Sequence, residues 1–316
     1  SNAMDRLEKY FLAVRPWSFT TSMMPVLIGN ALAYQSFQTL SLTILILTLI
    51  SALCVHSAAN LFNTYYDYIH GVDAPIPKTT NKKSSKTDID SIDDRTLIED
   101  RLKPNDVIRL GLILYAIGTF VFLLLAHISS ANEPYLALIF FGALPLSFLY
   151  TGGIGFKYIA LGDILILLIF GPITVVYSYM AQAGHYSIYP VLYALPLTLN
   201  TEAILHANNS RDMNHDRSVG ILTLSILLGK RLSYYLYCLL IYSPYFMISY
   251  ITINISWLCC LPLVTISHAY RLCQAFKHEQ LLKLPNQTAL LNFQFGVLYI
   301  VSIMLTNILR SRQEFF

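Results

Sequence analysis

The chain has 316 residues, of which 55% are hydrophobic and only 12% are charged. Soluble domains carry about 25% charged residues, so this composition excludes an ordinary soluble domain and predicts a membrane protein. The formal net charge of +3 is too small to indicate a nucleic-acid partner. Ser1-Asn2-Ala3 before Met4 has the form of an expression scar and is left out of the predicted fold. We expect one domain over residues 4–316.

Nine segments are long and apolar enough to cross a bilayer, which takes about 20 residues as a helix. They are 16–35, 41–62, 105–127, 134–150, 161–182, 188–207, 232–251, 254–270 and 289–309. Several contain proline, which membrane helices tolerate because neighbouring helices re-satisfy the freed backbone groups. No alternating strand pattern is visible. The prediction is an all-α fold with nine transmembrane helices.

The basic residues support this number of spans. With nine spans, one side of the membrane receives the N-terminus and the loops near 63–104, 151–160, 208–231 and 271–288. Of the 21 basic residues, 19 lie on that side, and only Arg310 and Arg312 lie opposite. Cytoplasmic loops are enriched in Lys and Arg, so we expect the N-terminus in the cytoplasm and the C-terminus outside. The membrane is then a bacterial inner membrane or a eukaryotic internal membrane.

A polar cluster closes the second apolar segment. Asn63 and Asp67 are four residues apart, so they share one face of a continuing helix. Gly71 permits a sharp turn, after which Asp73 returns toward the same point. By itself such a cluster is most often a solvated or capped helix end. Its position on the side that carries nearly all the acids suggests an active site instead.

A second cluster closes the sixth apolar segment. Asn208, Asp212 and Asp216 are spaced four apart, so we expect them on one helical face. Mg²⁺ prefers carboxylate and amide oxygens together with substrate phosphates. The prediction is that the two clusters face each other, hold Mg²⁺ and bind a diphosphate. Nearby cations would stabilise the charge on the leaving diphosphate; they are Arg95, Lys157, Arg211 and Arg217.

Three further features leave alternatives open. The Gly-rich loop 150–157 either lets backbone N–H groups approach a phosphate or is only a tight turn between helices. Glu202 and His206, four apart inside a predicted span, either face a cavity or partner or pair only with each other. The polar segment 74–92 is predicted to be a mobile cytoplasmic loop.

These strings together resemble the UbiA superfamily of intramembrane prenyltransferases. Within it they are similar to the branch of the vertebrate UbiA prenyltransferase domain-containing protein and bacterial MenA. The similar strings are Arg15-Pro-Trp-Ser-Phe, Asn63-Thr-Tyr-Tyr-Asp67, Asp93-Asp94-Arg95-Thr-Leu, Tyr150-Thr-Gly-Gly-Ile-Gly-Phe-Lys157, Thr201-Glu-Ala-Ile-Leu-His206 and Asn208-Asn-Ser-Arg-Asp212. The resemblance implies nine helices around a central cavity with two Asp-rich motifs on the cytoplasmic side.

The resemblance also implies a reaction. Two Mg²⁺ ions would ionise a polyprenyl diphosphate, geranylgeranyl or longer, and its chain would alkylate an aromatic quinol. The quinone-making branch implies a naphthoquinol or dihydroxynaphthoate acceptor, as in menaquinone (vitamin K2) synthesis. By motif, the metal ligands are Asn63, Asp67, Asp73, Asn208, Asp212 and Asp216, with the four aspartates catalytic. The diphosphate contacts are Arg15, Arg95, Lys157, Asn209 and Arg211.

Two departures and several alternatives accompany this interpretation. Asp67 and Asp73 are six apart, whereas the common motif of the superfamily spaces its acids by four, and His70 stands where the branch has Lys. The segment 74–92 is longer than the corresponding family link. The alternative acceptors are 4-hydroxybenzoate, haem or a chlorophyllide. The alternative classes are a non-catalytic prenyl-lipid-binding membrane protein and, less compatible with acids at one face, a transporter.

Overall fold

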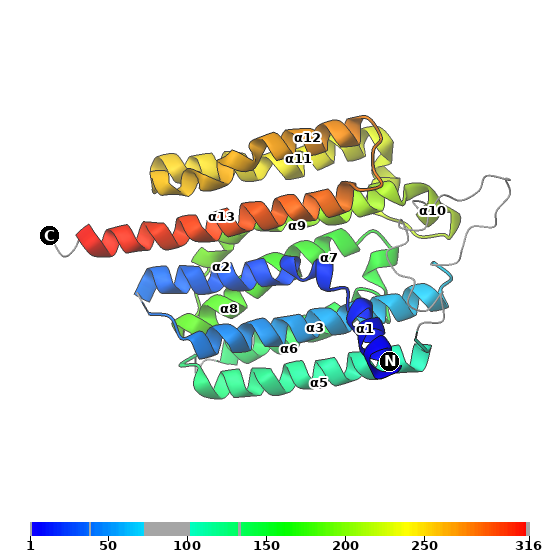
Figure 1. Cartoon of the computed structure of the whole chain (residues 1–316), viewed down its shortest axis with the longest axis horizontal. Helices are drawn as coiled ribbons and strands as arrows, with labels where there is room; N and C mark the ends of the chain where they lie inside the picture. Colours follow the sequence, from blue (N-terminus) through cyan, green and yellow to red (C-terminus); the bar gives the residue numbers. More distant parts are fainter. Residues whose placement is uncertain (1, 38, 73–101, 132–133, 314–316) are drawn as a thin grey trace.

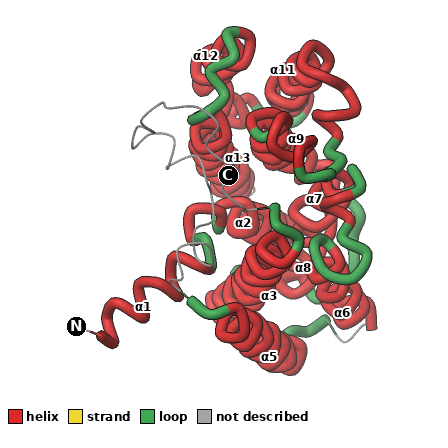
Figure 2. The backbone as a smooth tube through the Cα atoms, turned by 90° about the vertical axis from the view of Figure 1, so that its right-hand side faces the viewer, coloured by secondary structure: helices red, strands yellow, loops and turns green. Residues whose placement is uncertain are grey.

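The computed structural model describes residues 2–37, 39–72, 102–131 and 134–313. Helices run side by side along one direction and form a bundle, with α1 lying across it near one end (Figure 1). Seen along the bundle, the described part of the chain consists of helices packed side by side and the loops between them, and it contains no sheet (Figure 2). The all-α prediction is confirmed for these residues.

The helices follow one another in a simple order, with 3₁₀ and π segments marked η. They are α1 Asn2–Ala13, η1 Pro16–Ser18, α2 Thr20–Phe37, α3 Leu42–Ile69, α5 Pro104–Ile128, α6 Pro134–Leu149, η2 Phe156–Tyr158, α7 Gly162–Leu168, η3 Ile169–Ile173, α8 Thr174–Ala183, α9 Tyr189–Arg211, α10 Met213–Ser218, α11 Leu224–Asn254, η4 Trp257–Thr265, α12 Ile266–Lys277 and α13 Leu284–Gln313.

Helical structure occupies each predicted span, but the bounds differ. Within the described residues, five helices are long and apolar enough to cross a membrane, namely Leu42–Ile69, Pro104–Ile128, Gly162–Ala183, Leu224–Asn254 and Leu284–Thr306. The other predicted spans coincide with α2, α6, α9 and the pair η4–α12. The span predicted at 254–270 begins at the last residue of α11 and continues from Trp257 as the 3₁₀ segment η4, which contains Pro262. Proline removes a backbone donor from a regular helical ladder.

The outer faces of the long helices are apolar. Large exposed side chains gather on α5 and α11, including Leu112, Phe120, Leu123, Phe246, Tyr250 and Ile253. A soluble monomer rarely leaves so many apolar side chains in water, whereas lipid tails cover them without cost. Together with the helix lengths, these faces indicate an integral membrane protein.

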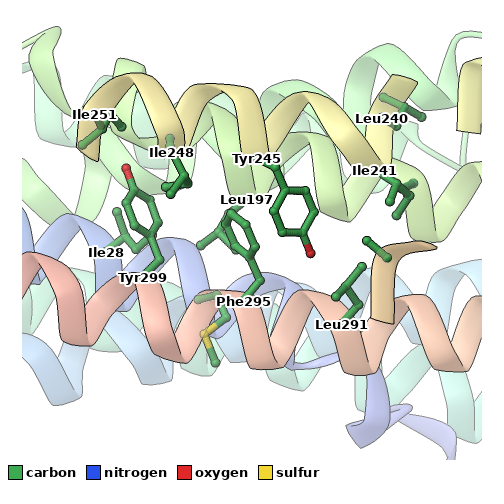
Figure 3. Close-up of a cluster of buried hydrophobic side chains, with 14 of the residues drawn as sticks. Ile28, Leu197, Leu240, Ile241, Tyr245, Ile248, Ile251, Leu291, Phe295 and Tyr299 are labelled. Atoms are coloured by element: carbon green, nitrogen blue, oxygen red, sulfur yellow. The ribbon is translucent and has the colours of Figure 1, made fainter. Parts of the chain in front are cut away.

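One core joins α11, η4, α12 and α13 to α2 and α9. Tyr245, Phe295 and Tyr299 interdigitate there with aliphatic side chains from the facing helices (Figure 3). The buried Tyr245 hydroxyl is hydrogen bonded to the Thr265 hydroxyl at 2.7 Å, so its polar end is satisfied. This core packs these helices together into one half of the bundle.

A second core joins α3, α5, α6 and α8. Phe122 and Phe140 stack with ring centroids 4.2 Å apart and planes 3° apart, and Tyr177 packs beside them. Between the two cores, α2 lies directly against α8. A Cβ on Gly29 would sit 2.6 Å from the Val175 carbonyl oxygen, so only glycine allows this approach.

The helix between α7 and α8 is wound loosely. Residues Ile169–Ile173 form a π-helical turn that contains Pro172, and the Thr174 hydroxyl donates to the Ile169 carbonyl at 2.5 Å. Such π-turns interrupt the regular ladder and recur at functional sites. Here the turn presents Phe170 to the cavity described below.

Candidate functional site

The first cluster lies where α3 ends. His70 closes α3, and Gly71 takes a left-handed φ of 70° so that the Val72 N–H donates back to the Asp67 carbonyl at 2.8 Å. This is the helix-terminating turn that glycine favours, and the predicted sharp turn at Gly71 is confirmed. Asn63 and Asp67 are both buried on the same side of the last turns of α3.

Lys157 neutralises this cluster from the loop after α6. Its ammonium nitrogen donates to Asp67 Oδ2 at 2.6 Å and to Asn63 Oδ1 at 2.9 Å. The Tyr158 hydroxyl donates to the other carboxylate oxygen of Asp67 at 2.8 Å. A buried carboxylate needs such partners, because an isolated charge is expensive to remove from water. The ammonium group of Lys157 therefore occupies the position in which Asn63 and Asp67 would bind a cation.

The Gly-rich loop places Lys157. The Lys157 N–H donates to the Tyr150 carbonyl at 2.8 Å, and the Gly152 and Gly155 N–H groups also donate within the turn. Gly155 has a left-handed φ of 63°, and a Cβ there would lie 2.6 Å from the Tyr158 ring. Of the two interpretations of this loop, the tight turn is the one that the structure favours.

The second cluster lies at the junction of α9 and α10. The helix is not continuous through this cluster, because the backbone of Asp212 lies near φ −92°, ψ 3° and ends α9 there, although Asn208, Asp212 and Asp216 all line the same cavity. The Arg211 guanidinium holds the Asp212 carboxylate through two bonds of 2.8 and 2.7 Å. Asn208 and Asp216 nevertheless remain on the cavity side of this junction.

Backbone contacts bring the two clusters together. The His215 ring donates from Nε2 to the Val72 carbonyl at 2.5 Å, which joins α10 to the end of α3. The Leu222 N–H donates to the Tyr158 carbonyl at 3.2 Å, which joins the chain after α10 to the Lys157 loop. Three segments far apart in sequence thus meet at one end of the bundle, as the position of α10 beside the end of α3 in Figure 1 shows.

Both clusters line one cavity of about 480 Å³. Polar residues form its mouth, and along α3 it extends inward from Asp67 to Ala52, about 22 Å at the helical rise. The deep walls are apolar, with side chains from α3, α6, η3 and α8. They include Val55, Ile139, Phe140, Ala143, Leu144, Ile173 and Tyr177. The cavity therefore suits an amphiphile with an anionic head and a long hydrocarbon chain.

The acidic side chains at the mouth of the cavity favour the binding of a cation. Burial, together with the Asp212 carboxylate, raises the pKa of the Asp216 carboxyl to about 6. Negative charge is therefore costly at this point of the ligand-free protein, and a cation bound here would be stabilised by the same carboxylate.

Most of the predicted site residues meet in this cavity. Nine of them line it: Arg15, Asn63, Asp67, Lys157, Asn208, Asn209, Arg211, Asp212 and Asp216. Asp73, Arg95 and the predicted mobile segment 74–92 lie outside the described residues. Arg15 lies on the α2 side of the cavity, where its charge acts on His56 and Tyr150.

Glu202 and His206 belong to the protein interior rather than to the cavity wall. The buried His206 ring donates from Nε2 to the Ser233 carbonyl at 2.9 Å, so it links α9 to α11. Glu202 lies near the Asp163 carboxyl, and its buried Oε2 makes no hydrogen bond within the described residues. His206 is bonded to another helix, so the alternative that Glu202 and His206 pair only with each other is wrong.

Sequence reasoning gave no role to several residues that the structure places here. Tyr158 and His215 make the contacts just described, and His56 and Asn60 line the cavity below Asn63. A signal was present in the sequence, because positions 56, 60, 63 and 67 follow helical spacing and form one polar stripe on an apolar helix.

Comparisons with known proteins agree with this architecture. The family model of the UbiA prenyltransferase family matches residues 22–304. The chain belongs to the UbiA prenyltransferase family. It is 46% identical over 305 residues to the UbiA prenyltransferase domain-containing protein 1 homolog of Drosophila melanogaster, covering 96% of this chain and 81% of that protein. The identity to human UbiA prenyltransferase domain-containing protein 1 is also 46%, over 301 residues, covering 95% of this chain and 85% of the human protein.

Solved UbiA structures share the fold. An apo UbiA homolog from Aeropyrum pernix K1 superposes with a TM-score of 0.65 at 16% identity, covering 89% of this chain and 97% of the homolog. A homolog from Archaeoglobus fulgidus, bound to GPP and Mg²⁺, gives a TM-score of 0.61 at 15% identity, covering 93% of this chain and 99% of the homolog. The chain is therefore an integral membrane prenyltransferase of the UbiA family.

The donor set suits a divalent cation of the hard type. Carboxylate and amide oxygens face the cavity mouth, which is the ligand chemistry that Mg²⁺ prefers. Among the described residues, no three Asp, Glu, His or Cys side chains converge closely enough to bind a metal by themselves. Mg²⁺ commonly takes only one or two carboxylates and completes its shell with water and substrate phosphate, so this geometry fits a site that the substrate completes.

Proposed function

We propose that this UbiA prenyltransferase transfers an isoprenyl chain from a polyprenyl diphosphate to an aromatic quinol, with Mg²⁺ as the cofactor. The acceptor is a naphthoquinol or dihydroxynaphthoate, as in menaquinone synthesis. The observation that carries the proposal is the pairing of two Asn-x₃-Asp clusters with Lys157 and Arg211 at the mouth of a long apolar cavity. The sequence resemblance to the quinone-making branch supports the acceptor.

The acid clusters bind the metal in this mechanism. The residues that would hold Mg²⁺ are Asn63, Asp67, Asn208, Asp212 and Asp216, with Asp73 added from the sequence motif. Two ions bound there would supply positive charge for the diphosphate oxygens and so make the diphosphate a better leaving group. The cytoplasmic side of a nine-span bundle is the side on which this mouth opens, in agreement with the distribution of basic residues.

Lys157 and Arg211 exchange partners when the substrate binds. Each now neutralises an aspartate, at 2.6 Å for Lys157–Asp67 and 2.7 Å for Arg211–Asp212. Both cationic side chains can turn from the aspartates toward the diphosphate oxygens, where they would stabilise the leaving group. Bound Mg²⁺ would then supply the positive charge beside the carboxylates. The same two side chains therefore stabilise the ligand-free site and the departing diphosphate.

The cavity walls position the chain and protect the reacting carbon. The deep apolar residues bind the hydrocarbon tail by burying its surface, which contributes about 25 cal/mol per Å². The aromatic side chains of Tyr150 and Phe170 also line the cavity. Aromatic faces stabilise nearby positive charge, as at an ionising allylic carbon, and they exclude water that would otherwise capture it.

A panel of acceptors tests the proposal. Purified protein in lipid nanodiscs receives a radiolabelled geranylgeranyl diphosphate, Mg²⁺ and one of four acceptors: a naphthoquinol, dihydroxynaphthoate, 4-hydroxybenzoate or haem. We expect labelled product with the naphthalene acceptors, abolished by chelation and by Asp67→Ala or Asp212→Ala. Transfer only to another acceptor would overturn the naphthoquinol assignment. Full activity in both alanine variants would overturn the two-cluster mechanism, and binding without transfer to any acceptor would indicate a lipid-binding protein.

A further inference from the structure

The polar stripe of α3 continues below the metal-binding cluster into the cavity. His56, Asn60, Asn63 and Asp67 are spaced by four, three and four residues, so they lie along one side of the helix. All four line the cavity. Only the last two belong to the diphosphate cluster, so the inner two lack a role in the mechanism above. Polar side chains at depth in a membrane helix are costly and commonly mark a substrate site.

His56 is built into a recess between α2 and α3. Its Nδ1 lies 2.9 Å from the Ser22 hydroxyl, and its Nε2 lies 3.4 Å from the Ser18 hydroxyl. Asn60 supports the same recess, because its amide donates to Ser18 Oγ at 3.1 Å and to the Val14 carbonyl at 3.0 Å. The bond between Ser22 and Nδ1 fixes the orientation of the His56 ring, whereas the contact of Nε2 with Ser18 is near the distance limit for a hydrogen bond.

Two aromatic rings border the imidazole. The Phe170 ring meets it edge to face with centroids 4.9 Å apart, and the Phe19 ring does so at 5.8 Å. Phe170 also lines the cavity from the π-helical turn. A flat aromatic ligand would find an apolar face on Phe170 and a hydrogen-bonding edge on His56. This combination differs from the aliphatic walls farther inside, which suit a hydrocarbon chain.

The distance along α3 matches an aromatic acceptor. His56 lies seven residues from Asn63, which is about 10 Å at the helical rise. The first carbon of a prenyl diphosphate lies just inside the diphosphate, so a fused bicyclic ring in contact with that carbon extends toward His56. The hydroxyl on the carbon next to the alkylated carbon then meets the imidazole, and its oxygen is the one that becomes a ketone when that carbon is alkylated. The recess and the diphosphate site are therefore placed to hold the two reactants end to end.

We infer that His56 binds a hydroxyl of the aromatic acceptor through Nε2 and accepts its proton during transfer. This inference rests on the proposed function and adds the residue that activates the acceptor. As the ring carbon bonds to the first prenyl carbon, the carbon–oxygen bond to diphosphate breaks and the hydroxyl proton passes to His56. The resulting ketone then loses the proton from the alkylated carbon to diphosphate or water, while His56 returns its proton to the oxygen. The aromatic ring is restored, and the net products are the prenylated quinol and protonated diphosphate.

Two substitutions separate this role from a purely structural one. His56→Asn keeps a polar group near the Nδ1 position, where Ser22 lies, but removes the atom at Nε2. His56→Gln reaches the Nε2 position yet is not a base at neutral pH. His268→Asn is the matched control, because His268 is a half-buried histidine on α12 outside the cavity and is hydrogen bonded to Gln294 at 3.0 Å.

Each variant is assayed by steady-state transfer to 2-methyl-1,4-naphthoquinol and to its monomethyl ethers, which lack one hydroxyl. We expect His56→Asn to lower kcat with the quinol roughly 100-fold, as removal of a general base does, with a donor KM within twofold of wild type. With the ether that lacks the hydroxyl at His56, wild type and variant should differ less than threefold. His56→Gln should recover quinol KM but not kcat.

Calorimetric titration of 2-methyl-1,4-naphthoquinol without donor gives a second readout that does not depend on turnover. We expect His56→Asn to weaken this binding about tenfold. Equal losses with quinol and ethers, an unchanged quinol KM and kcat, or a raised donor KM would each overturn the role of His56. An inactive wild type would overturn the proposed function itself, so the two failures are distinguishable. Thermal unfolding of all variants establishes that they are folded before they are compared.

Discussion

The ion pair between Lys157 and Asp67 yields the sharpest prediction, through the variant Lys157→Met. Asp67 is 5% exposed and Lys157 is 24% exposed, at 2.6 Å. Removal of one partner from a fully buried ion pair costs about 3–5 kcal/mol. Because Lys157 is partly exposed and solvent screens its charge, we expect a smaller loss of about 1–3 kcal/mol in unfolding free energy when divalent cations are chelated.

The same variant should bind Mg²⁺ more tightly. In wild type the ammonium occupies the position between Asn63 and Asp67, so a metal ion has to displace it. In Lys157→Met, Mg²⁺ no longer has to break the Lys157–Asp67 pair, so its binding free energy becomes more favourable by about 1–3 kcal/mol. This corresponds to a roughly 5- to 150-fold higher affinity. Prenyl transfer should nevertheless fall about 100- to 1,000-fold, because the leaving diphosphate loses a cation. Tighter metal binding with slower turnover is the signature of a lysine that exchanges partners.

Two assays check this pair of outcomes. Differential scanning fluorimetry in detergent, with chelator or with increasing Mg²⁺, gives the stability and the metal affinity, and labelled donor gives the transfer rate. Lys230→Met is the matched control, because Lys230 forms a 3.0 Å pair with Glu279 in which both side chains are about two-thirds exposed. That control should change neither quantity appreciably. The reasoning fails if Lys157→Met binds Mg²⁺ no more tightly than wild type, or if it transfers prenyl groups at the wild-type rate.

Three further predictions follow from the site and its walls. The pKa of Asp216 is about 6 in the folded protein and near 3.8 in the unfolded chain, so the folded state binds this proton more tightly. The stability gained from this proton is complete below pH 3.8 and is lost as pH rises through 6. Metal-free protein should therefore gain at most about 3 kcal/mol from pH 7 to pH 4 by thermal unfolding, and Asp216→Asn should flatten this trend; an unchanged trend would contradict it. Gly155→Ala should lower transfer at least tenfold by displacing the turn that carries Lys157, since φ is 63° and the added Cβ meets the Tyr158 ring; wild-type kinetics would refute this. Phe140→Ala should cost about 3–5 kcal/mol and shift donor preference toward longer diphosphates in a competition assay, because the stacked ring borders the deep end of the cavity; an unaltered product distribution would count against that boundary.

Local spacing made much of this site predictable. The interval of four between Asn63 and Asp67, and among Asn208, Asp212 and Asp216, assigns each set to one end of a helix. Helical periodicity is a property of neighbouring residues, so a single sequence displays it directly. The polar stripe of α3 extends inward to His56, and its helical spacing can be read from the sequence alone.

Partners from distant segments were not predictable in the same way. Lys157 stands 90 residues from Asp67, and their 2.6 Å contact depends on how the loop after α6 folds over the end of α3. The break at Asp212 likewise ends a helix that spacing alone predicts to continue to Asp216. Such contacts are decided by packing between helices, which a pattern along one helix does not encode.

The sequence by itself determined that this is a helical membrane protein with two Asn-x₃-Asp clusters, because hydropathy, charge and helical spacing are local properties. Only the tertiary structure decided that Lys157 bridges Asn63 and Asp67 and that His56 lies in a recess with Ser22. The physical reason is that a side chain's partner depends on which helices lie beside it. In this protein those neighbours are set by two separate cores with the cavity between them.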